Sequence, residues 1–234
     1  MRAEAAVKGR PRHELSMALF RPPALALVRA LARAGVRPEP VVVCHCLLGL
    51  AAAALVAASS PTAWLVAAAL LQLKTVLDNA DGALARSTDT VTELGRYLDT
   101  VLDFVVNVAL FAALAAHGPW ALSALALVVL TLVLSWDFNS EWLYKAARSG
   151  AAAAPGAARA AEPIAEPIAA EQAPGGGALL HGFRGFYQVV FEPQDRLVRR
   201  LDTALFRLAG GSDYAPGSPE RAAWSDMLST AALV

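Results

Sequence analysis

Hydrophobic residues gather along this chain into long runs that charged residues do not interrupt. The longest run, from Val41 to Leu73, has 33 positions without a charged side chain. A helix needs roughly 20 apolar residues to cross a bilayer, so this run holds most of two crossings. The turn at Ser59–Thr62 divides them, and its proline can start the second helix. We predict a first crossing at 41–59 and a second at about 62–86.

Two more apolar segments follow. Thr90 and Glu93 have the spacing of a capping box, which predicts a third helix from Val91 to about residue 116. The turn His117–Pro119 separates it from a fourth crossing at 120–136, whose ends carry tryptophans, as is common at membrane interfaces. The predicted fold class is an all-α integral membrane protein, a helical bundle with about four full transmembrane helices.

Amphipathic segments flank these crossings. Residues 1–40 contain eight Lys or Arg and three Glu, and Arg29 and Arg33 share one side of a helix whose other side is apolar. This pattern predicts a helix that lies in the lipid interface and ends near Gly35. The predicted segments, in chain order, are a basic N-terminal region with this interfacial helix (1–40), a transmembrane core (41–145), a disordered Ala/Pro/Gly linker (146–180), a cytoplasmic amphipathic helix (181–210), and a linker with the start of a truncated fifth transmembrane helix (211–234).

Composition supports the membrane assignment. Hydrophobic residues make up 56% of the chain and charged residues only 17%, which is too apolar for an ordinary soluble domain. The turns at 59–62 and 117–119 contain no Lys or Arg, whereas the N-terminal region, the 86–96 connection and the residues after Lys145 are basic. By the positive-inside rule the basic segments face the cytoplasm of a plasma or inner membrane. We expect no nucleic-acid partner and no cleaved signal peptide.

The tripeptide Cys44-His45-Cys46 in the first crossing looks like a metal-binding sequence. Successive helix residues point about 100° apart, so three neighbouring side chains cannot converge on one ion. We therefore interpret the cysteines as small packing residues around a membrane histidine.

Carboxylates concentrate where the second and third crossings meet. Asp78 and Asp81 share one face of the second helix, and Asp99 and Asp103 share one face of the third. A short loop joins the two helices, so we expect them to be antiparallel neighbours whose four carboxylates meet across one seam. An ionised aspartate inside a membrane costs roughly 2.5–3.5 kcal/mol, and four of them repel one another. The carboxylates could be paired with arginines and backbone groups. We favour the other interpretation, in which they bind one or two divalent cations such as Mg²⁺, Mn²⁺ or Ca²⁺.

Small and basic residues accompany the aspartates. Gly82 and Ala85 share the acidic side of the second helix, and Gly95 lies one turn before Asp99. Such residues either let helices approach closely or let a flat ligand lie against the backbone. Arg86 can reach a phosphate group with its fork of donors. Lys74, one turn before the first aspartate, either pairs with Asp78 or faces a substrate.

These residues together resemble the signature of the CDP-alcohol phosphatidyltransferase family. All eight signature positions and every spacing are present, as Asp78, Asp81, Gly82, Ala85, Arg86, Gly95, Asp99 and Asp103. The signature covers 26 residues, and the helix plan around it extends the resemblance over roughly residues 20–145. It implies six transmembrane helices, frequent homodimers, and a pair of divalent ions, usually Mg²⁺ or Mn²⁺.

The resemblance also implies a role for each signature residue. Asp78, Asp81, Asp99 and Asp103 would be metal ligands, and Asp103 would also be the general base that deprotonates the acceptor hydroxyl. The CDP moiety would bind at three residues of the second helix, Gly82, Ala85 and Arg86, with Gly95 giving it room.

The implied reaction belongs to phospholipid biosynthesis. A substituted phosphate group would move from a CDP-linked lipid or alcohol donor, with CDP-diacylglycerol favoured, to a small alcohol or lipid acceptor, with release of CMP. Arg184, Arg196, Arg199 and Arg200 would bind either an acceptor phosphate or, as we favour, the anionic headgroups of membrane lipids.

Some features depart from the family pattern. The segment that in many members reads Pro-Asn-x-x-Thr is here Pro38-Glu39-Pro40-Val41-Val42, and we expect the fifth and sixth helices of the family to be absent. One alternative is therefore a truncated or inactive membrane scaffold of the same fold. Another alternative, an Asp-rich intramembrane prenyltransferase, needs a second Asp-rich motif, whereas Asp137 and Asp195 stand alone in the sequence.

Overall fold

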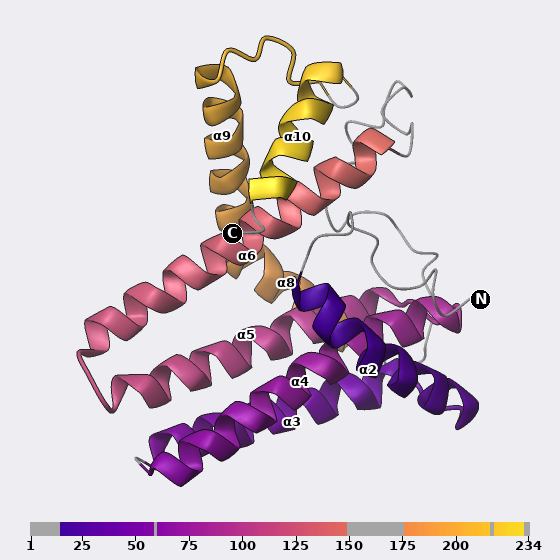
Figure 1. Ribbon diagram of the computed structural model, residues 1–234, viewed down its shortest axis with the longest axis vertical. Coiled ribbons are helices and arrows are strands. Elements are labelled where there is room, and N and C mark those ends of the chain that lie inside the picture. The colour runs from indigo at the N-terminus through magenta and orange to yellow at the C-terminus, as the bar shows by residue number, and fades with distance from the viewer. Residues whose placement is uncertain (1–14, 59, 149–175, 216–217, 232–234) are drawn as a thin grey trace. The chain divides into compact units, whose positions relative to one another are not determined.

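The computed structural model describes residues 15–58, 60–148, 176–215 and 218–231, with side chains left undescribed at a few of these positions. Within these ranges all regular structure is helical (Figure 1). The helices are α2 (Leu15–Arg33), α3 (Pro38–Ala57), α4 (Pro61–Ser87), α5 (Glu93–Ala115), α6 (Trp120–Arg148), α8 (Gly176–Val190), α9 (Glu192–Leu208) and α10 (Pro219–Ala231). A helix of this series corresponds to the predicted interfacial helix and to each of the four predicted crossings. The predicted break between the first two crossings is also present, since α3 ends at Ala57 and α4 begins at Pro61.

Three segments of the described chain are long and apolar enough to cross a membrane. They are Pro38–Ala57 in α3, Leu94–Ala115 in α5 and Trp120–Ser140 in α6. Helix α4 has 27 residues and therefore a length of about 40 Å, but Lys74 and the aspartates after it make it less apolar. The all-α membrane bundle is confirmed. Three of the four expected crossings are both long enough and apolar enough to span a bilayer.

The start of α5 differs from the prediction. The N-cap is Thr92, whose Oγ1 accepts a hydrogen bond from the backbone N–H of Gly95 at 3.0 Å. The expected capping box beginning at Thr90 is wrong, because that residue lies in the loop with its Oγ1 2.7 Å from Oγ1 of Thr88. Thr92 has an extended backbone, with φ −118° and ψ 152°, which directs its hydroxyl at an otherwise unpaired N–H of the first turn.

Other helix ends follow from proline and glycine. Helix α3 begins at Pro38, before the expected first crossing, because a proline in the first helical turn loses no hydrogen bond. Helix α2 ends at Arg33, close to the predicted stop at Gly35. Gly35 has φ 67°, and the N–H of Val36 donates to the carbonyl of Leu31. Helix α6 continues to Arg148, well beyond the predicted end at 136.

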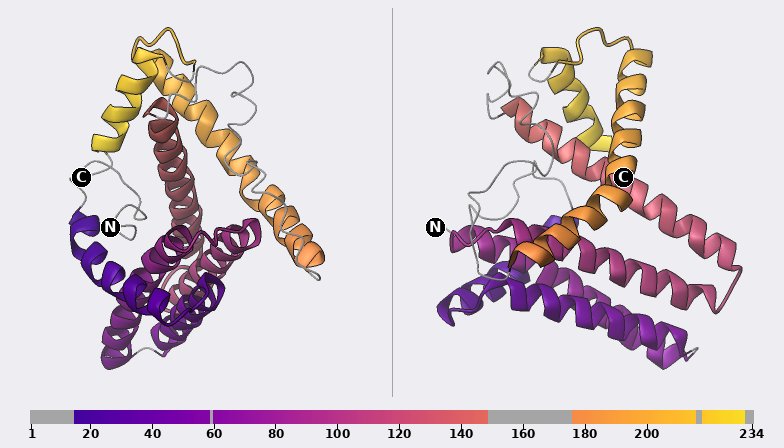
Figure 2. Two further views of the ribbon diagram at one scale, coloured as in Figure 1. Left: turned by 90° about the vertical axis from the view of Figure 1, so that its right-hand side faces the viewer. Right: turned by 180° about the vertical axis from the view of Figure 1, so that it is seen from behind.

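The chain divides into two compact units, of which the first comprises residues 1–128 and 172–184. In this unit α3 packs closely against both α4 and α5, and α2 packs against α4 (Figure 2). Side chains such as Lys74 and Asp103 connect α4 to α5. The two acidic helices meet through their side chains, while α3 packs closely against both of them.

A glycine permits the close approach of α3 and α5. A Cβ atom placed on Gly49 would lie 2.5 Å from Cγ1 of Val106, a residue that is itself fully buried. Small residues continue this face of α3 toward its C-terminal end, where Ala52 and Val56 join Ala67 of α4 and Ala113 of α5 in one apolar cluster. The small side chains let the three backbones come together, as is common between membrane helices.

The backbone carbonyl of Val56 connects the ends of these helices that lie away from the aspartates. The oxygen of Val56 accepts a hydrogen bond from Nε1 of Trp64 at 3.0 Å and contacts Nε2 of His117 at 2.8 Å. The two rings meet edge to face with their centroids 5.4 Å apart. This cluster links the C-terminal end of α3, the start of α4 and the turn after α5.

The second unit comprises residues 129–171 and 185–234 and includes α9 and α10. Asp202 of α9 is almost fully buried and accepts hydrogen bonds from Tyr214 Oη and from Trp224 Nε1, the latter at 2.8 Å. Nη2 of Arg221 lies 3.5 Å from the same carboxylate. Burial, and then the hydrogen bond to Asp202, raise the pKa of Tyr214 to about 12. These contacts hold the two helices together through a satisfied buried charge.

The predicted single helix at 181–210 is two helices in the structure. Helix α8 ends at Val190 and α9 begins at Glu192, with Pro193 in its first turn. Because proline cannot donate a backbone hydrogen bond to the preceding helix, the chain starts a new one there. Most of the predicted linker, residues 149–175, lies outside the described residues. Helix α10 has 13 residues and is too short to cross a bilayer.

Candidate active site

Carboxylates from two helices converge on one place in the first unit. One ligand atom each from His45, Asp78, Asp99 and Asp103 can be chosen so that all four lie within 4.8 Å of one another. Asp81 joins the group through its Oδ2, which is 3.0 Å from Nε2 of His45. The structure thus brings together the four aspartates that the sequence predicted to meet, and adds a histidine from a third helix.

Helical periodicity explains how each helix presents its pair. Asp78 and Asp81 lie one turn apart on α4, and Asp99 and Asp103 lie one turn apart on α5. Asp81 is the most enclosed of them, with 4% of its surface exposed, while the other three are half-buried. The site is therefore closed at Asp81 and open enough at the remaining aspartates to admit a ligand.

His45 is a member of the acidic cluster that the sequence pattern did not identify. It is fully buried, with Nε2 3.4 Å from Oδ1 of Asp99 and Nδ1 3.7 Å from Oδ1 of Asp103. Its neighbours point elsewhere, since Cys44 is exposed and Sγ of Cys46 lies 4.0 Å from the carbonyl oxygen of Leu102. The three side chains diverge as predicted, but the histidine belongs to the acidic site.

A signal for His45 was present in the sequence. It lies one turn before Gly49 and two turns before Ala52, on the small-residue face of α3 that packs against the other helices. An ionisable residue within a membrane helix generally faces the bundle interior and marks a functional site. The position of His45 on the small-residue face of α3, rather than its cysteine neighbours, indicates that it faces the other helices.

Lys74 pairs with a different aspartate from the one expected. Its Nζ lies 2.6 Å from Oδ1 of Asp103, across from α4 to α5. The sequence offered Asp78 or a substrate as its partner, whereas the structure shows a direct contact with Asp103. Both Lys74 and His45 approach the same oxygen of Asp103, so the charge of that carboxylate is balanced on its Oδ1 side.

The small residues of the signature lie close to the site for different reasons. A Cβ atom on Gly82 would lie 3.2 Å from Nη1 of Arg86, so the absence of a side chain lets the arginine fold back along α4. Ala85 is half-buried one turn after Asp81, and Arg86 is exposed. A Cβ atom on Gly95 would lie 3.0 Å from Oγ1 of Thr92, which is the helix cap. The guanidinium group of Arg86 therefore lies over Gly82, and Gly95 contacts the cap residue at the start of α5.

The donor set fits a divalent cation. Two atoms bound at about 2.1 Å to the same ion are at most about 4.2 Å apart, close to the separation of the four ligand atoms of this cluster. Four of its buried atoms have no hydrogen-bond partner of acceptable geometry: His45 Nδ1, His45 Nε2, Asp81 Oδ2 and Asp99 Oδ1. Buried polar atoms normally have partners, and a group of such atoms without hydrogen bonds that face a common centre suits the ligand set of a cation.

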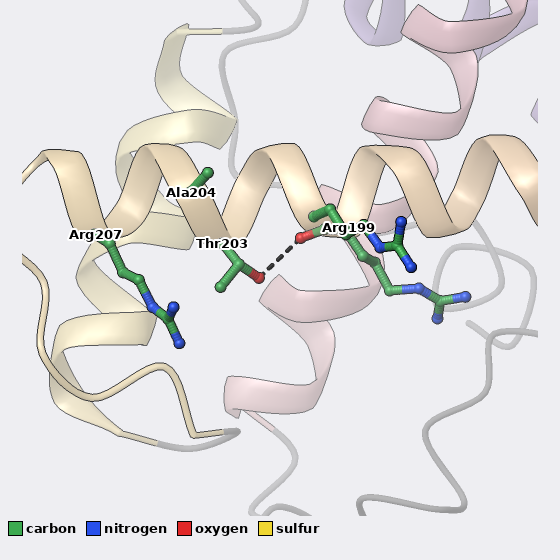
Figure 3. Close-up of a pocket in the computed structure, with 5 residues that line it drawn as sticks. Arg199, Thr203, Ala204 and Arg207 are labelled. Carbon is green, nitrogen blue, oxygen red and sulfur yellow. Dashed lines mark hydrogen bonds between the residues drawn. The ribbon is translucent and has the colours of Figure 1, made fainter.

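Arginines of α9 form a separate surface in the second unit. Arg199, Arg200 and Arg207 border a shallow surface pocket with Thr203 and Ala204 (Figure 3). The Thr203 hydroxyl donates to the carbonyl of Arg199 at 2.8 Å, so it does not point at the guanidinium groups. Arg184 is not part of this surface, since it belongs to α8.

Comparison with known proteins identifies the family to which this site belongs. The family model described as CDP-alcohol phosphatidyltransferase matches residues 37–162, which is more than half of the chain and includes all of α3, α4, α5 and α6. The chain belongs to the CDP-alcohol phosphatidyltransferase family. The resemblance predicted from the signature is thereby confirmed, and the apolar helices α3, α5 and α6 agree with a membrane-embedded protein.

A curated relative supports the same assignment. The chain is 39% identical over 109 residues to a protein of Aquifex aeolicus (strain VF5) named "Bifunctional IPC transferase and DIPP synthase". The match covers 47% of this chain and 21% of that protein, so the chain spans about a fifth of the relative's length. No solved structure matches the chain.

Proposed function

We propose that this protein transfers a substituted phosphate group from a CDP-alcohol, with CDP-diacylglycerol as the favoured donor, to an acceptor alcohol, and that CMP is released. The observation that carries the proposal is the convergence of Asp78, Asp99, Asp103 and His45 within 4.8 Å, with Asp81 against the histidine. Membership of the phosphatidyltransferase family supports this reaction for the carboxylate cluster.

The aspartates would hold one or two divalent ions, Mg²⁺ or Mn²⁺. Ions bound there would neutralise the pyrophosphate of the donor, polarise its phosphoryl oxygens and stabilise the leaving CMP. The chain's own contribution is to fix four carboxylates from two helices, with Asp81 held against His45 of a third. In this proposal Asp78, Asp81, Asp99 and Asp103 are the ligands.

The CDP moiety would lie beside the acidic cluster along α4. Arg86 is exposed and folded over Gly82, so its planar fork lies at the surface where a phosphate oxygen can reach it. Ala85, on the same side of α4, and Gly95, near the start of α5, present little side chain to a flat base or ribose. We propose that these four residues bind the nucleotide part of the donor.

Asp103 would act as the general base. The acceptor oxygen forms a new bond to the phosphorus that carries the lipid or alcohol, and the bond from that phosphorus to the bridging oxygen breaks. CMP keeps the electron pair, and the acceptor proton moves to the Asp103 carboxylate. Since Lys74 and His45 approach Oδ1, the other oxygen, Oδ2, is the proton acceptor in this scheme.

The surroundings of the reaction follow from the same proposal. The site would face the cytoplasm at the inner leaflet, as the distribution of Lys and Arg in the loops predicts. The acceptor would be a small alcohol or a lipid, and anionic membrane lipids would bind the arginines of α9. We also propose a homodimer, because dimers are frequent in this family.

The role of Asp103 predicts a specific kinetic defect. Changing Asp103→Asn should reduce transfer from labelled CDP-diacylglycerol to a panel of alcohols by about 10²- to 10⁴-fold, the usual contribution of a general base. The variant should remain folded and still bind the donor with metal. Asp89→Asn is the matched control, since Asp89 is an exposed aspartate of the same segment outside the cluster. Near-normal turnover of the Asp103 variant would refute the base assignment, and no turnover by the wild-type protein with any alcohol would favour the inactive scaffold.

A further inference from the structure

We propose that His45 supplies a nitrogen ligand to the divalent cation of the acidic site and thereby makes the site prefer Mn²⁺ to Mg²⁺. The inference deepens the proposed function and rests on it only in requiring that the aspartates bind a divalent ion. None of the eight signature residues is a histidine, so the family motif does not supply this ligand.

The position of His45 is the first support. The side chain is fully buried in the face of α3 that packs on α4 and α5, and its ring lies between carboxylates of both helices. Nδ1 has no hydrogen-bond partner, and Oδ1 of Asp103 lies 3.7 Å from it. A buried imidazole nitrogen that carries a lone pair and has no partner is costly unless another partner is present. The cation that the aspartates require would be that partner.

The distances suit a histidine that ligates through one nitrogen and donates through the other. Nε2 lies 3.0 Å from Oδ2 of Asp81, which is hydrogen-bonding distance for an N–H donor. In that tautomer Nδ1 carries the lone pair, and it lies 3.7 Å from Oδ1 of Asp103. Adjacent ligands of an octahedral ion are about 3.0 Å apart and opposite ones about 4.2 Å, so this separation fits two ligands of one ion. The arrangement is that of a carboxylate that orients a metal-bound histidine.

Packing fixes the histidine at this position. One turn further along α3, Gly49 contacts Val106 of α5 so closely that no Cβ could fit. One turn earlier, Val41 belongs to the apolar cluster that joins α3 to Ala80 and Leu84 of α4. These contacts on either side hold the backbone of α3 against both acidic helices. His45 is therefore placed by rigid elements, which a metal ligand requires.

A nitrogen donor changes which ion is preferred. Mg²⁺ takes oxygen ligands almost exclusively. Mn²⁺ also suits carboxylates, but it belongs to the first-row transition metals, whose sites can include nitrogen donors. A site of carboxylates alone would favour neither ion strongly. Adding the imidazole of His45 would shift the balance toward Mn²⁺.

The competing interpretation is that His45 acts only as a counter-charge. A protonated imidazole among Asp81, Asp99 and Asp103 would neutralise part of the cluster, and it would have no lone pair to offer an ion. The two interpretations differ in one observable quantity, the direct coupling between a bound metal and a histidine nitrogen.

Pulsed electron paramagnetic resonance of bound Mn²⁺ measures that coupling. The full chain in lipid nanodiscs with one equivalent of Mn²⁺ should show the modulation of a directly coordinated ¹⁴N nucleus. Incorporation of ¹⁵N-histidine should replace it with the ¹⁵N pattern in an otherwise unchanged protein. His45→Gln should abolish the coupling, while Cys44→Ser, an exposed neighbour on the same helix, should retain it.

Competition between the two ions provides a second readout. In the wild-type protein and in Cys44→Ser, the Mg²⁺ concentration that displaces half of the Mn²⁺ should be at least about tenfold higher than in His45→Gln. Bound Mn²⁺ without nitrogen coupling in the wild-type protein would overturn the inference and leave the counter-charge interpretation. Failure of Mn²⁺ to bind at all would overturn it as well, and neither result depends on the stability of a variant.

These measurements need no turnover, so they separate the inference from the proposed function. Nitrogen coupling in a protein that transfers no phosphate group would contradict the proposed function alone. Transfer activity in a protein whose bound Mn²⁺ shows no nitrogen coupling would contradict the role of His45 alone.

Discussion

Asp103 is the aspartate that both basic side chains of the site approach. Nζ of Lys74 contacts its Oδ1 at 2.6 Å, and Nδ1 of His45 lies 3.7 Å from the same atom. Lys74 is largely buried, with 14% of its side chain exposed, so it has left water for this contact. An ion pair in such surroundings restrains the carboxylate and balances its charge. Lys74 is thus a positioning residue for the proposed base.

Removing the lysine should therefore affect turnover more than donor binding. We expect Lys74→Met to lower kcat for transfer by about tenfold to a hundredfold, because a base that is no longer held in place loses part of its 10²- to 10⁴-fold contribution. KM for the CDP-linked donor should change little, and Lys74→Arg should restore most of the rate. An unchanged kcat in the methionine variant would mean that the contact has no part in positioning Asp103.

The residues of the site differ in how far the sequence could predict them. Asp78 with Asp81, and Asp99 with Asp103, follow from helical spacing alone, because residues one turn apart share a face. The partner of Lys74 and the role of His45 depend instead on which helices pack together. That choice depends on contacts between helices, such as the one between Gly49 and a valine of α5, which helical spacing alone does not give.

At the scale of elements, α3 organises the site. It packs against both acidic helices, whereas α4 and α5 reach each other through long side chains.

The turns and caps were predicted less well than the helices themselves. Pro61 starts α4 and Gly35 ends α2 as expected, but Thr92 rather than Thr90 caps α5. Neighbouring threonines have the same capping chemistry, so only the backbone conformation decides between them.

The close contact of α3 with α5 should be sensitive to added volume. Gly49→Val places side-chain atoms where Cγ1 of Val106 lies 2.5 Å away, so the helices must separate. Overpacking of this kind typically costs about 1–3 kcal/mol. We expect a lower midpoint of thermal unfolding in nanodiscs, together with weaker Mn²⁺ binding because His45 moves away from α5.

A second glycine serves as the control for this substitution. A Cβ atom placed on Gly118 would meet no other atom within 4 Å, so Gly118→Val should leave both quantities nearly unchanged. If Gly49→Val left the unfolding midpoint and Mn²⁺ binding at wild-type values, the contact would not determine the spacing of the helices.

At the scale of the whole molecule, one membrane unit contains every residue of the proposed catalytic site. Residues 1–128 with 172–184 form that unit, and it includes the complete eight-residue signature. The family match extends over residues 37–162 and so includes the same helices. The number and order of the apolar helices could be predicted because burial in lipid requires long apolar runs. The division between α8 and α9 could not, because amphipathic periodicity continues across Pro193.

Equilibrium binding of labelled CDP-diacylglycerol to the purified full chain in nanodiscs tests the central claim most directly. We predict binding that requires Mn²⁺ or Mg²⁺, is lost on chelation, returns when the ion is restored, and is weakened at least about tenfold by Asp78→Asn on α4 and by Asp99→Asn on α5. Binding that persists with chelator present and in both variants would contradict a shared cation site formed by the two helices.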